Sequence, residues 1–229
     1  FRVTHSVSDS VGLILHTPAG IIVHTGDFKL DQTPVDGEIT DYYKLAEAGE
    51  RGVLALLSDS THADRPGYTP SERVVGESLS KVFHTAKGRI IITTFASNVP
   101  RIQQVIDVAT EYGRKVCVVG RSMEMVVEVS LNMGYLRAPL GTLIDVADIG
   151  KYPASKIVIL STGSQGEPLS ALSRMSVGDH RKVEIVEGDL VIMAASPVPG
   201  NETMVSRVVD NLFRRGASVV YTPESMVHV

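Results

Sequence analysis

Residues 89–112, RIIITTFASNVPRIQQVIDVATEY, contain the pattern that decides the fold. The first part, RIIITTF, is rich in β-branched side chains, which suit a buried strand. Small polar residues follow, and the stretch 98–112 carries a helical pattern with Pro100 in its first turn, where a missing N–H does no harm. These residues therefore predict a strand, a polar loop and a helix in direct succession.

The same alternation of apolar strand and helix continues on both sides of this stretch. A helix is expected over residues 71–84, because Ser71 is a plausible cap and apolar residues recur on one stripe. Further strands are expected at KVCVV, KIVIL, LVIMAA and SVVYT, with helices at 122–135, around 169–175 and at 202–216. Short apolar strands that alternate with helices indicate a parallel sheet flanked by helices, so the predicted fold class is α/β.

Residues 1–60 follow a different pattern. The segments VGLIL and GIIVH are separated by a short connection that contains Pro18 and Gly20, which is typical of a hairpin. A helix is expected over 41–49, and the strand VLALLSD follows it. The stretch STHADRPGYTP then predicts a boundary, with one domain at 1–60 and a second at 61–229 that includes its connecting segments.

The composition is that of a globular protein with a substantial core. Of 229 residues, 43% are hydrophobic and 21% are charged, and no apolar run approaches the ~18 residues of a membrane helix. The single cysteine, Cys117, lies in an apolar run and excludes an internal disulfide, which fits a reducing, cytoplasmic setting. The net charge of -4 argues against a broadly basic nucleic-acid surface. Any anion site must therefore be a local cluster.

Small polar residues follow the ends of the predicted parallel strands, in the loops TFASN, GRSM, STGSQGEP and ASPVPGNE. Ligands of open parallel sheets bind at this edge, and the N–H groups that begin the following helices favour phosphate. We expect a phosphate-bearing ligand there, held by Ser164 and by charge-assisted contacts from Arg101 and Arg121. Turn formation alone explains any one of these loops. None has the Gly-Lys-Ser/Thr of a P-loop or a Gly-x-Gly-x-x-Gly pattern, which disfavours a dinucleotide cofactor.

Acidic and histidine side chains stand near strand ends in the first domain. Asp27 follows GIIVH, Asp59 ends VLALLSD, and His5 follows the start of a strand. Imidazole and carboxylate groups both suit zinc, so these side chains could converge on one metal. An aspartate before a turn commonly caps backbone N–H groups. From these residues alone, the turn interpretation is favoured.

A resemblance that covers nearly the whole chain is carried, in consistent order, by the strings THSVSDSVG, VHTGDFKLDQTP, SDSTHADRPGYTPSE, TTFASN, GRSM, STGSQGEP and SPVPGNE. Together they resemble the ribonuclease J family, in the β-CASP branch of the metallo-β-lactamase superfamily. The resemblance implies part of a metallo-β-lactamase αββα domain at 1–60, followed by a β-CASP domain. The parallel sheet of a β-CASP domain agrees with the α/β pattern read from the residues.

The resemblance also implies a site and an activity. In that family the histidine of THS and the aspartate of HTGD are metal ligands, here His5 and Asp27, and the aspartate commonly bridges two zinc ions. Asp59 matches the first signature acid of β-CASP proteins, and Ser97 is similar in position to residues that help hold the 5′ phosphate of RNA. The implied activity is zinc-dependent RNA hydrolysis, as 5′-to-3′ exonuclease and endonuclease, in RNA processing and decay. The implied partners are RNA and further copies of the protein, in dimers or tetramers.

The resemblance has gaps at both ends. The family's His-x-His-x-Asp-His motif would lie before Phe1 and its later histidine motifs beyond Val229, so we expect the catalytic site to be incomplete in this segment. Because zinc sites usually need about three or more protein ligands, the segment alone is expected to be inactive. Two alternatives stay open: a non-catalytic module that binds nucleic acid or nucleotide phosphates, and a metallo-β-lactamase-type hydrolase of a small molecule.

Overall fold

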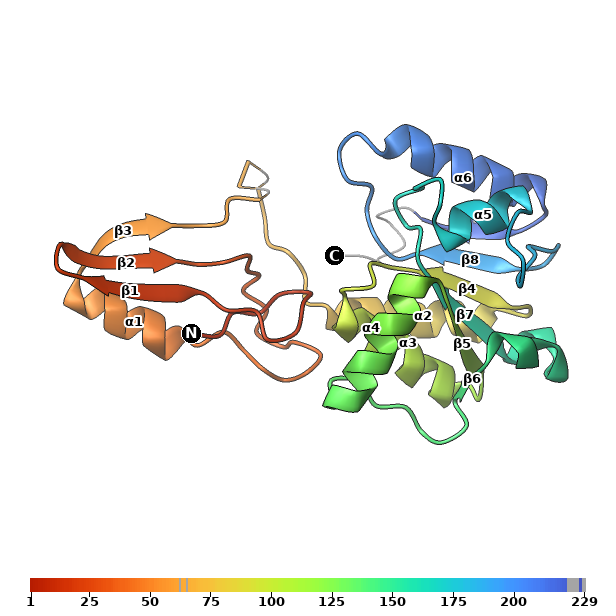
Figure 1. Ribbon diagram of the computed structural model, residues 1–229, viewed down its shortest axis with the longest axis horizontal. Helices are drawn as coiled ribbons and strands as arrows, with labels where there is room; N and C mark the ends of the chain where they lie inside the picture. The colour runs from red at the N-terminus through yellow and green to blue at the C-terminus, as the bar shows by residue number, and fades with distance from the viewer. Residues whose placement is uncertain (62, 65, 222–226, 228–229) are drawn as a thin grey trace. The chain divides into compact units, whose positions relative to one another are not determined.

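The computed structural model describes residues 1–61, 63–64, 66–221 and 227. The chain forms two compact units, Phe1–Arg73 and Val74–Val229, which can be followed by their colours in Figure 1. The division falls at the start of helix α2 (Arg73–Thr85), just after the boundary stretch expected at 60–70. Residues 62 and 65 of that stretch lie outside the described residues.

The second unit is built on a six-stranded sheet with the order β6-β5-β7-β4-β8-β9. Every neighbouring pair of strands in it is parallel. The strands are β4 (Ile90–Thr93), β5 (Lys115–Val119), β6 (Leu143–Ile144), β7 (Ile157–Ser161), β8 (Leu190–Met193) and β9 (Ser218–Val220). The predicted α/β class, with a parallel sheet flanked by helices, is confirmed.

Helices cover both faces of this sheet (Figure 1). Helices α2, α3 (Val99–Glu111) and α4 (Arg121–Met133) lie on one face, and α5 (Ala171–Val177) and α6 (Glu202–Arg214) lie on the other. Successive side chains of a strand point to opposite faces. Ile90 and Ile92 accordingly pack with the first group of helices, and Ile91 packs with the second. Because both faces are buried, each position of the strand needs an apolar residue.

The connection between β5 and β7 contains short elements that the sequence did not predict. These are β6 and two 3₁₀ helices, η1 (Val146–Lys151) and η2 (Ala154–Lys156). A strand of two residues is too short to show a periodicity, so it appears only when Val116 and Cys117 of β5 pair with it. Among the described helices, none combines the length and the apolar character needed to cross a membrane.

The first unit contains a three-stranded sheet with the order β1-β2-β3. Strands β1 (Leu13–Thr17) and β2 (Gly20–His24) form the expected antiparallel hairpin, and β3 (Val53–Leu57) pairs with β2 in parallel. Helix α1 (Tyr42–Arg51) connects β2 to β3. Its N-terminus is capped by Asp41, whose carboxylate accepts a hydrogen bond from Lys44 N at 3.2 Å. Unlike the larger sheet, this one exposes many apolar side chains: Leu13, Leu15, Leu54, Leu56 and Leu57.

Candidate functional site

A cavity of about 800 Å³ opens where three parallel strands of the second unit end. Thr94 after β4, Gly120 after β5 and Thr162 after β7 contribute to its lining. These strands are neighbours in the sheet, and the chain passes from one side of β4 to the other between β7 and β8. Open α/β sheets hold their ligands at such a switch point, and the volume is within the range of ligand sites, ~300 to 1,000 Å³.

The backbone around this cavity depends on glycine. Gly163 has a φ of +109°, and a Cβ atom there would lie 2.5 Å from Ser170 Oγ, so a larger residue is excluded. Gly120 precedes α4 with a φ of +113°, and no side chain caps the first turn of that helix. The N–H of Gly120 is bound by Glu124 Oε1 at 3.2 Å. The next N–H groups of α4 lack side-chain partners, which leaves them available to an anion.

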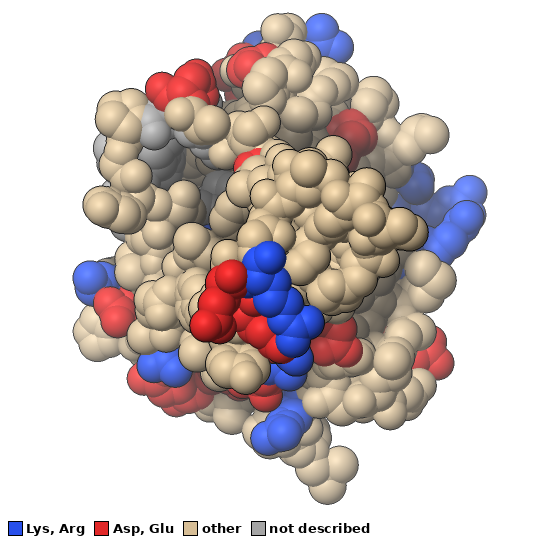
Figure 2. All heavy atoms as spheres, turned by 90° about the vertical axis from the view of Figure 1, so that its left-hand side faces the viewer, with Lys and Arg blue, Asp and Glu red and all other residues tan. Residues whose placement is uncertain are grey.

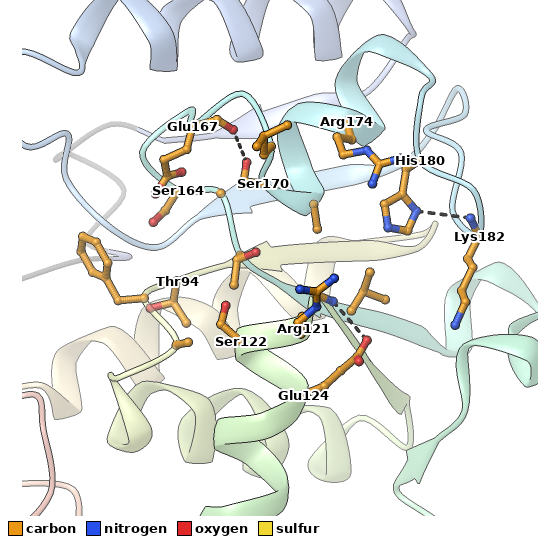
Figure 3. A pocket seen from close by; sticks show the side chains of 18 of the residues that line it. Thr94, Arg121, Ser122, Glu124, Ser164, Glu167, Ser170, Arg174, His180 and Lys182 are labelled. Atoms are coloured by element: carbon orange, nitrogen blue, oxygen red, sulfur yellow. Dashed lines mark hydrogen bonds between the residues drawn. The ribbon is translucent and has the colours of Figure 1, made fainter.

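The charged side chains of the cavity are mostly basic. Figure 3 shows Arg121 near the middle, the hydroxyl-bearing Thr94, Ser122 and Ser164 on one side of it, and Arg174, His180 and Lys182 on the other. Arg181 also lines the cavity, and the acidic members of the lining are Glu124 and Glu167. The cavity is thus a local basic cluster in a protein whose net charge is -4. On the face shown in Figure 2, by contrast, acidic and basic side chains are interspersed.

The pKa of His180 reports on this environment. It lies below its ordinary value of 6.5, first because the ring is partly buried, and then because Arg174 and Lys182 place positive charge beside it. His180 Nδ1 accepts a hydrogen bond from the backbone N–H of Val183 at 3.1 Å. A neutral imidazole that already accepts a hydrogen bond is a structural support for the loop 180–183, and the positive charge of the cavity comes from the neighbouring cations.

Of the phosphate ligands predicted from the sequence, the structure brings two together. Arg121 and Ser164 both line the cavity. Ser97 is exposed and lies one residue beyond Ala96, which lines the same cavity. Arg101 lies elsewhere.

The expectation for Arg101 as a phosphate ligand needs correction. Its residue is 0% exposed, and its Nη1 donates hydrogen bonds to the carbonyl oxygens of Ala194 at 3.0 Å and Val227 at 2.9 Å. A position three residues after the helix cap Asn98 points inward, because α3 packs that face against the sheet. Arg101 therefore stabilises the interior of the second unit, and a ligand in the cavity does not reach it.

The predicted acids of the first unit lie at one edge of its sheet. Thr25 N donates to the carbonyl oxygen of Leu57 at 3.0 Å, and Asp59 N donates to Thr25 Oγ1 at 3.0 Å. These bonds continue the parallel pairing of β2 and β3 beyond the strands. Asp27 and Asp59 thus follow neighbouring strands at their carboxyl ends, as the sequence predicts.

A glycine sets the conformation just before Asp27. Gly26 has a φ of +64°, and a Cβ atom there would lie 2.5 Å from the carbonyl oxygen of Val11. The residues after Asp27 are fixed as well, because Lys29 N donates to the carbonyl oxygen of Thr4 at 2.7 Å. Since His5 follows Thr4, this bond brings the N-terminal segment beside the loop that carries Asp27. The Asp27 side chain itself is exposed.

Asp59 has two sets of neighbours. Its Oδ1 accepts hydrogen bonds from Thr61 N at 2.9 Å and Thr61 Oγ1 at 2.7 Å. These bonds to Thr61 are the main cause of a pKa below the ordinary 3.8, and the N–H of Phe28 and the charge of His5 lower it further. Asp59 therefore caps a turn, as the simpler interpretation has it. It also stands beside His5 and beside Phe28, the residue that follows Asp27.

The described residues do not form a complete metal site by themselves. Within residues 1–61, 63–64, 66–221 and 227, no three His, Cys, Asp or Glu side chains are grouped so that they could hold a metal ion. Zinc sites take about three or four protein ligands. His5 and Asp27 therefore suit zinc by the chemistry of their donors, but their number does not suffice.

Sequence reasoning missed the basic side of the cavity. Arg174, His180, Arg181 and Lys182 were not predicted as site residues, although Asp179-His180-Arg181-Lys182 is a visible charged run. The run lies in a loop between α5 and β8, and a loop without periodicity gives no indication of which way its side chains point. Its position before a strand start also suggests the edge of the sheet opposite to the cavity.

Comparison with known proteins identifies the family. The family profile described as "Ribonuclease J, beta-CASP domain" matches residues 87–212. Proteins named Ribonuclease J match the whole chain: the one from Thermus thermophilus is 49% identical, that from Synechocystis 46% and that from Mycolicibacterium smegmatis 44%. The chain spans 40%, 36% and 41% of the length of these relatives, respectively.

A solved structure shares the fold. A crystal structure of a protein of unknown function from Enterococcus faecalis superimposes with a TM-score of 0.62 and 15% sequence identity. The match covers 96% of this chain and 50% of that one. At this identity the likeness concerns the fold alone.

Proposed function

Because the chain belongs to the ribonuclease J family, we propose that it takes part in metal-dependent hydrolysis of RNA phosphodiester bonds. The action includes 5′-to-3′ exonuclease and endonuclease cleavage, in cytoplasmic RNA processing and decay. The chain spans about two fifths of its relatives, and the activity belongs to a protein of that full extent. RNA is the proposed substrate, and dimers or tetramers are the proposed assembly.

This proposal rests on the match to the Thermus thermophilus protein named Ribonuclease J. That protein is 49% identical over 230 aligned positions, and the match covers 100% of this chain. Such a match includes both the acidic edge of the first unit and the cavity of the second. The cavity supports it independently, because a basic cluster at the ends of parallel strands suits a phosphate-bearing ligand.

The proposed cofactor is zinc, with two ions in the complete site. His5 and Asp27 supply a nitrogen and carboxylate oxygens, the donor types that zinc accepts. A pair of zinc ions, when bound, supplies an activated water and charge stabilisation for phosphodiester cleavage. The part of this chain is to present Asp27 on a glycine-fixed loop and to hold His5 beside it.

A chimera tests the proposal. Residues 1–229 would replace the matching segment of the Thermus thermophilus relative, and hydrolysis of a 5′-labelled single-stranded RNA would be measured with and without a zinc chelator. We expect chelator-sensitive hydrolysis by the chimera and loss of at least about a hundredfold in rate after Asp27→Ala. Asp210→Ala, an exposed acid on α6, is the matched control and should leave the rate unchanged.

Two results would contradict the proposal. One is a folded chimera that does not cleave RNA while the parent enzyme does. The other is an Asp27→Ala chimera that keeps the unmodified rate. The 229-residue chain tested alone is expected to be inactive, since its described residues lack a complete metal site, and rapid RNA turnover by it would show that the site is complete without further ligands.

A further inference from the structure

The two sides of the cavity differ in chemistry. One side carries the hydroxyls of Thr94, Ser122 and Ser164, and the other carries the loop with Arg181 and Lys182. Arg121 stands between these sides at the start of α4. An arginine flanked by hydroxyl groups suits a phosphate oxygen. Arg181 and Lys182 lie on the other side of the cavity from the hydroxyl groups. They provide more positive charge than one phosphate group needs.

The cations of the cavity are incompletely neutralised. Arg174 is paired with the carboxylate of Asp179 at 3.3 Å. For Arg121, Arg181 and Lys182, no carboxylate lies within ion-pair distance in the part of the chain that the structure describes. Positive charge gathered without protein counterions raises the local concentration of anions.

A hydroxyl group in the lining also offers a contact to a ligand. Ser164 is only 3% exposed and lines the cavity, yet its hydroxyl forms no hydrogen bond with the described residues. Because Ser164 lines the cavity, its hydroxyl is available to a ligand there. Phe95, 37% exposed, adds an aromatic ring to the lining of the cavity.

We propose that the cavity binds two successive phosphates of one RNA strand, the first at Arg121 and Ser164 and the second at Arg181 and Lys182. This inference rests on the proposed function, with RNA as the substrate. It adds to that function a second subsite for an RNA phosphate. Proteins that hold single strands combine a cationic groove along the backbone with aromatic rings for the bases. Phe95 is an aromatic ring of the cavity lining on which a base could stack.

The two subsites can be separated by the length of the ligand. Uridine 5′-monophosphate carries one phosphate and fills only the first subsite, whereas the trinucleotide pUpUpU reaches both. Binding of each to the 229-residue chain would be measured by competition against a fluorescent oligonucleotide, with chelator present so that the strand stays intact. The variant is Arg181→Gln with Lys182→Gln. The matched control is Lys81→Gln with Lys87→Gln, two exposed cations of the same unit outside the cavity.

Counterion release sets the expected size of the effect. Each neutralised phosphate of a single strand contributes about -0.7 to the slope of log K against log salt. Loss of the second phosphate subsite should therefore make the slope shallower by about 0.7 and lower the affinity at ~0.1 M salt by about fivefold. We expect this loss for pUpUpU with the cavity variant and less than about twofold for the control pair. Uridine 5′-monophosphate should bind the cavity variant as it binds the unmodified chain, whereas Arg121→Gln should weaken both ligands.

The outcomes separate this inference from the proposed function. Equal binding of pUpUpU by the cavity variant and the control, or equal losses for both ligands, would overturn the second subsite and leave the nuclease proposal intact. Failure of the unmodified chain to bind any single-stranded RNA would count against RNA as its substrate, and so against both. Unfolding midpoints of the variants, measured by circular dichroism, would show that the substitutions leave the fold unchanged.

Discussion

The carboxylate of Asp31 accepts a hydrogen bond from the backbone N–H of Glu72 at 3.0 Å, across 41 residues of chain. The same carboxylate accepts a bond from Ser71 Oγ at 2.9 Å, and Thr33 N donates to its other oxygen at 2.9 Å. Asp31 lies four positions after Asp27 and is 6% exposed. It therefore connects the loop of the predicted metal ligand to Ser71 and Glu72, which directly precede α2.

Replacing Asp31 with alanine should loosen this connection. The N–H groups of Thr33 and Glu72 would be left without their acceptor, at a cost of about 1 to 3 kcal/mol. Amide hydrogen exchange at these two groups should become about tenfold faster or more. Asp210→Ala on α6 should change neither exchange rate. Unchanged protection of Thr33 and Glu72 in Asp31→Ala would show that the carboxylate does not hold them.

Acid should weaken the first unit through the same residue. Burial raises the pKa of Asp31, but hydrogen bonds from Thr33, Glu72 and Ser71 outweigh burial and place the pKa below its ordinary 3.8. A carboxyl group whose pKa is lower in the folded state adds stability above its unfolded pKa, and this stability is lost as the pH falls through the folded value. The urea midpoint of the first unit should therefore fall below about pH 4, and fall less in Asp31→Asn.

Asp36, in the same unit, has a pKa shift in the opposite direction to that of Asp31. Asp36 is exposed, but partial desolvation of its carboxyl group raises its pKa above 3.8, and the charges of Asp9 and Asp31 raise it further. Ionisation of Asp36 therefore costs stability at neutral pH, and the cost is relieved as the pH falls through the raised pKa. Asp36→Asn should raise the urea midpoint at about pH 7, where Asp31→Asn lowers it. Shifts of equal sign in the two variants would contradict the assigned causes.

The second unit depends on an ion pair between Arg89 and Asp189. Arg89 Nη2 and Nε lie 2.6 Å and 2.9 Å from the two carboxylate oxygens, and Asp189 is 2% exposed. Arg89→Met leaves this buried charge without its cation and should lower the free energy of unfolding by about 3 kcal/mol or more. Lys151→Met, which removes an exposed pair with Asp148, should leave the thermal midpoint unchanged. A midpoint of Arg89→Met equal to that of the control would refute the assignment.

Arg101 and Arg121, both predicted from the sequence to contact phosphate, should respond differently to substitution. Arg101 donates to interior carbonyl oxygens, so Arg101→Met should lower the free energy of unfolding by about 2 kcal/mol or more. Arg121 is exposed and lines the cavity, so Arg121→Met should keep the stability and weaken binding of uridine 5′-monophosphate. Thermal denaturation and the binding competition measure the two effects in one set of variants. Loss of stability in Arg121→Met together with loss of binding alone in Arg101→Met would contradict these assignments.

Cys117 should be inert in the folded chain. It is 0% exposed, and burial, with smaller contributions from Asp145 and Glu124, raises the pKa of its thiol to about 12. The thiolate is the reactive form, so a disulfide reagent at about pH 8 should react only as fast as the second unit opens. Adding urea should raise the labelling rate in parallel with unfolding. Immediate labelling of the native chain would contradict the burial of β5.

Much of the fold could be predicted because it repeats a simple pattern. Residues Ile90–Ile92 of β4 are apolar at successive positions, and a strand buried on both faces requires this. The seven motif strings spread along the chain likewise predicted a family, and the comparisons confirm it. The grouping of Asp27 and Asp59 at one sheet edge follows from their positions after parallel strands.

The sequence by itself determined the α/β class, the family and the glycine-rich strand ends, because these depend on residues that are near one another in the chain. Only the tertiary structure decided that Arg101 is interior, that Arg121 and Ser164 share a cavity, and that the loop with Arg181 and Lys182 completes it. The direction of a side chain from a helix start or an irregular loop depends on packing against distant segments. The residues next to such a side chain in the sequence therefore do not show which way it points.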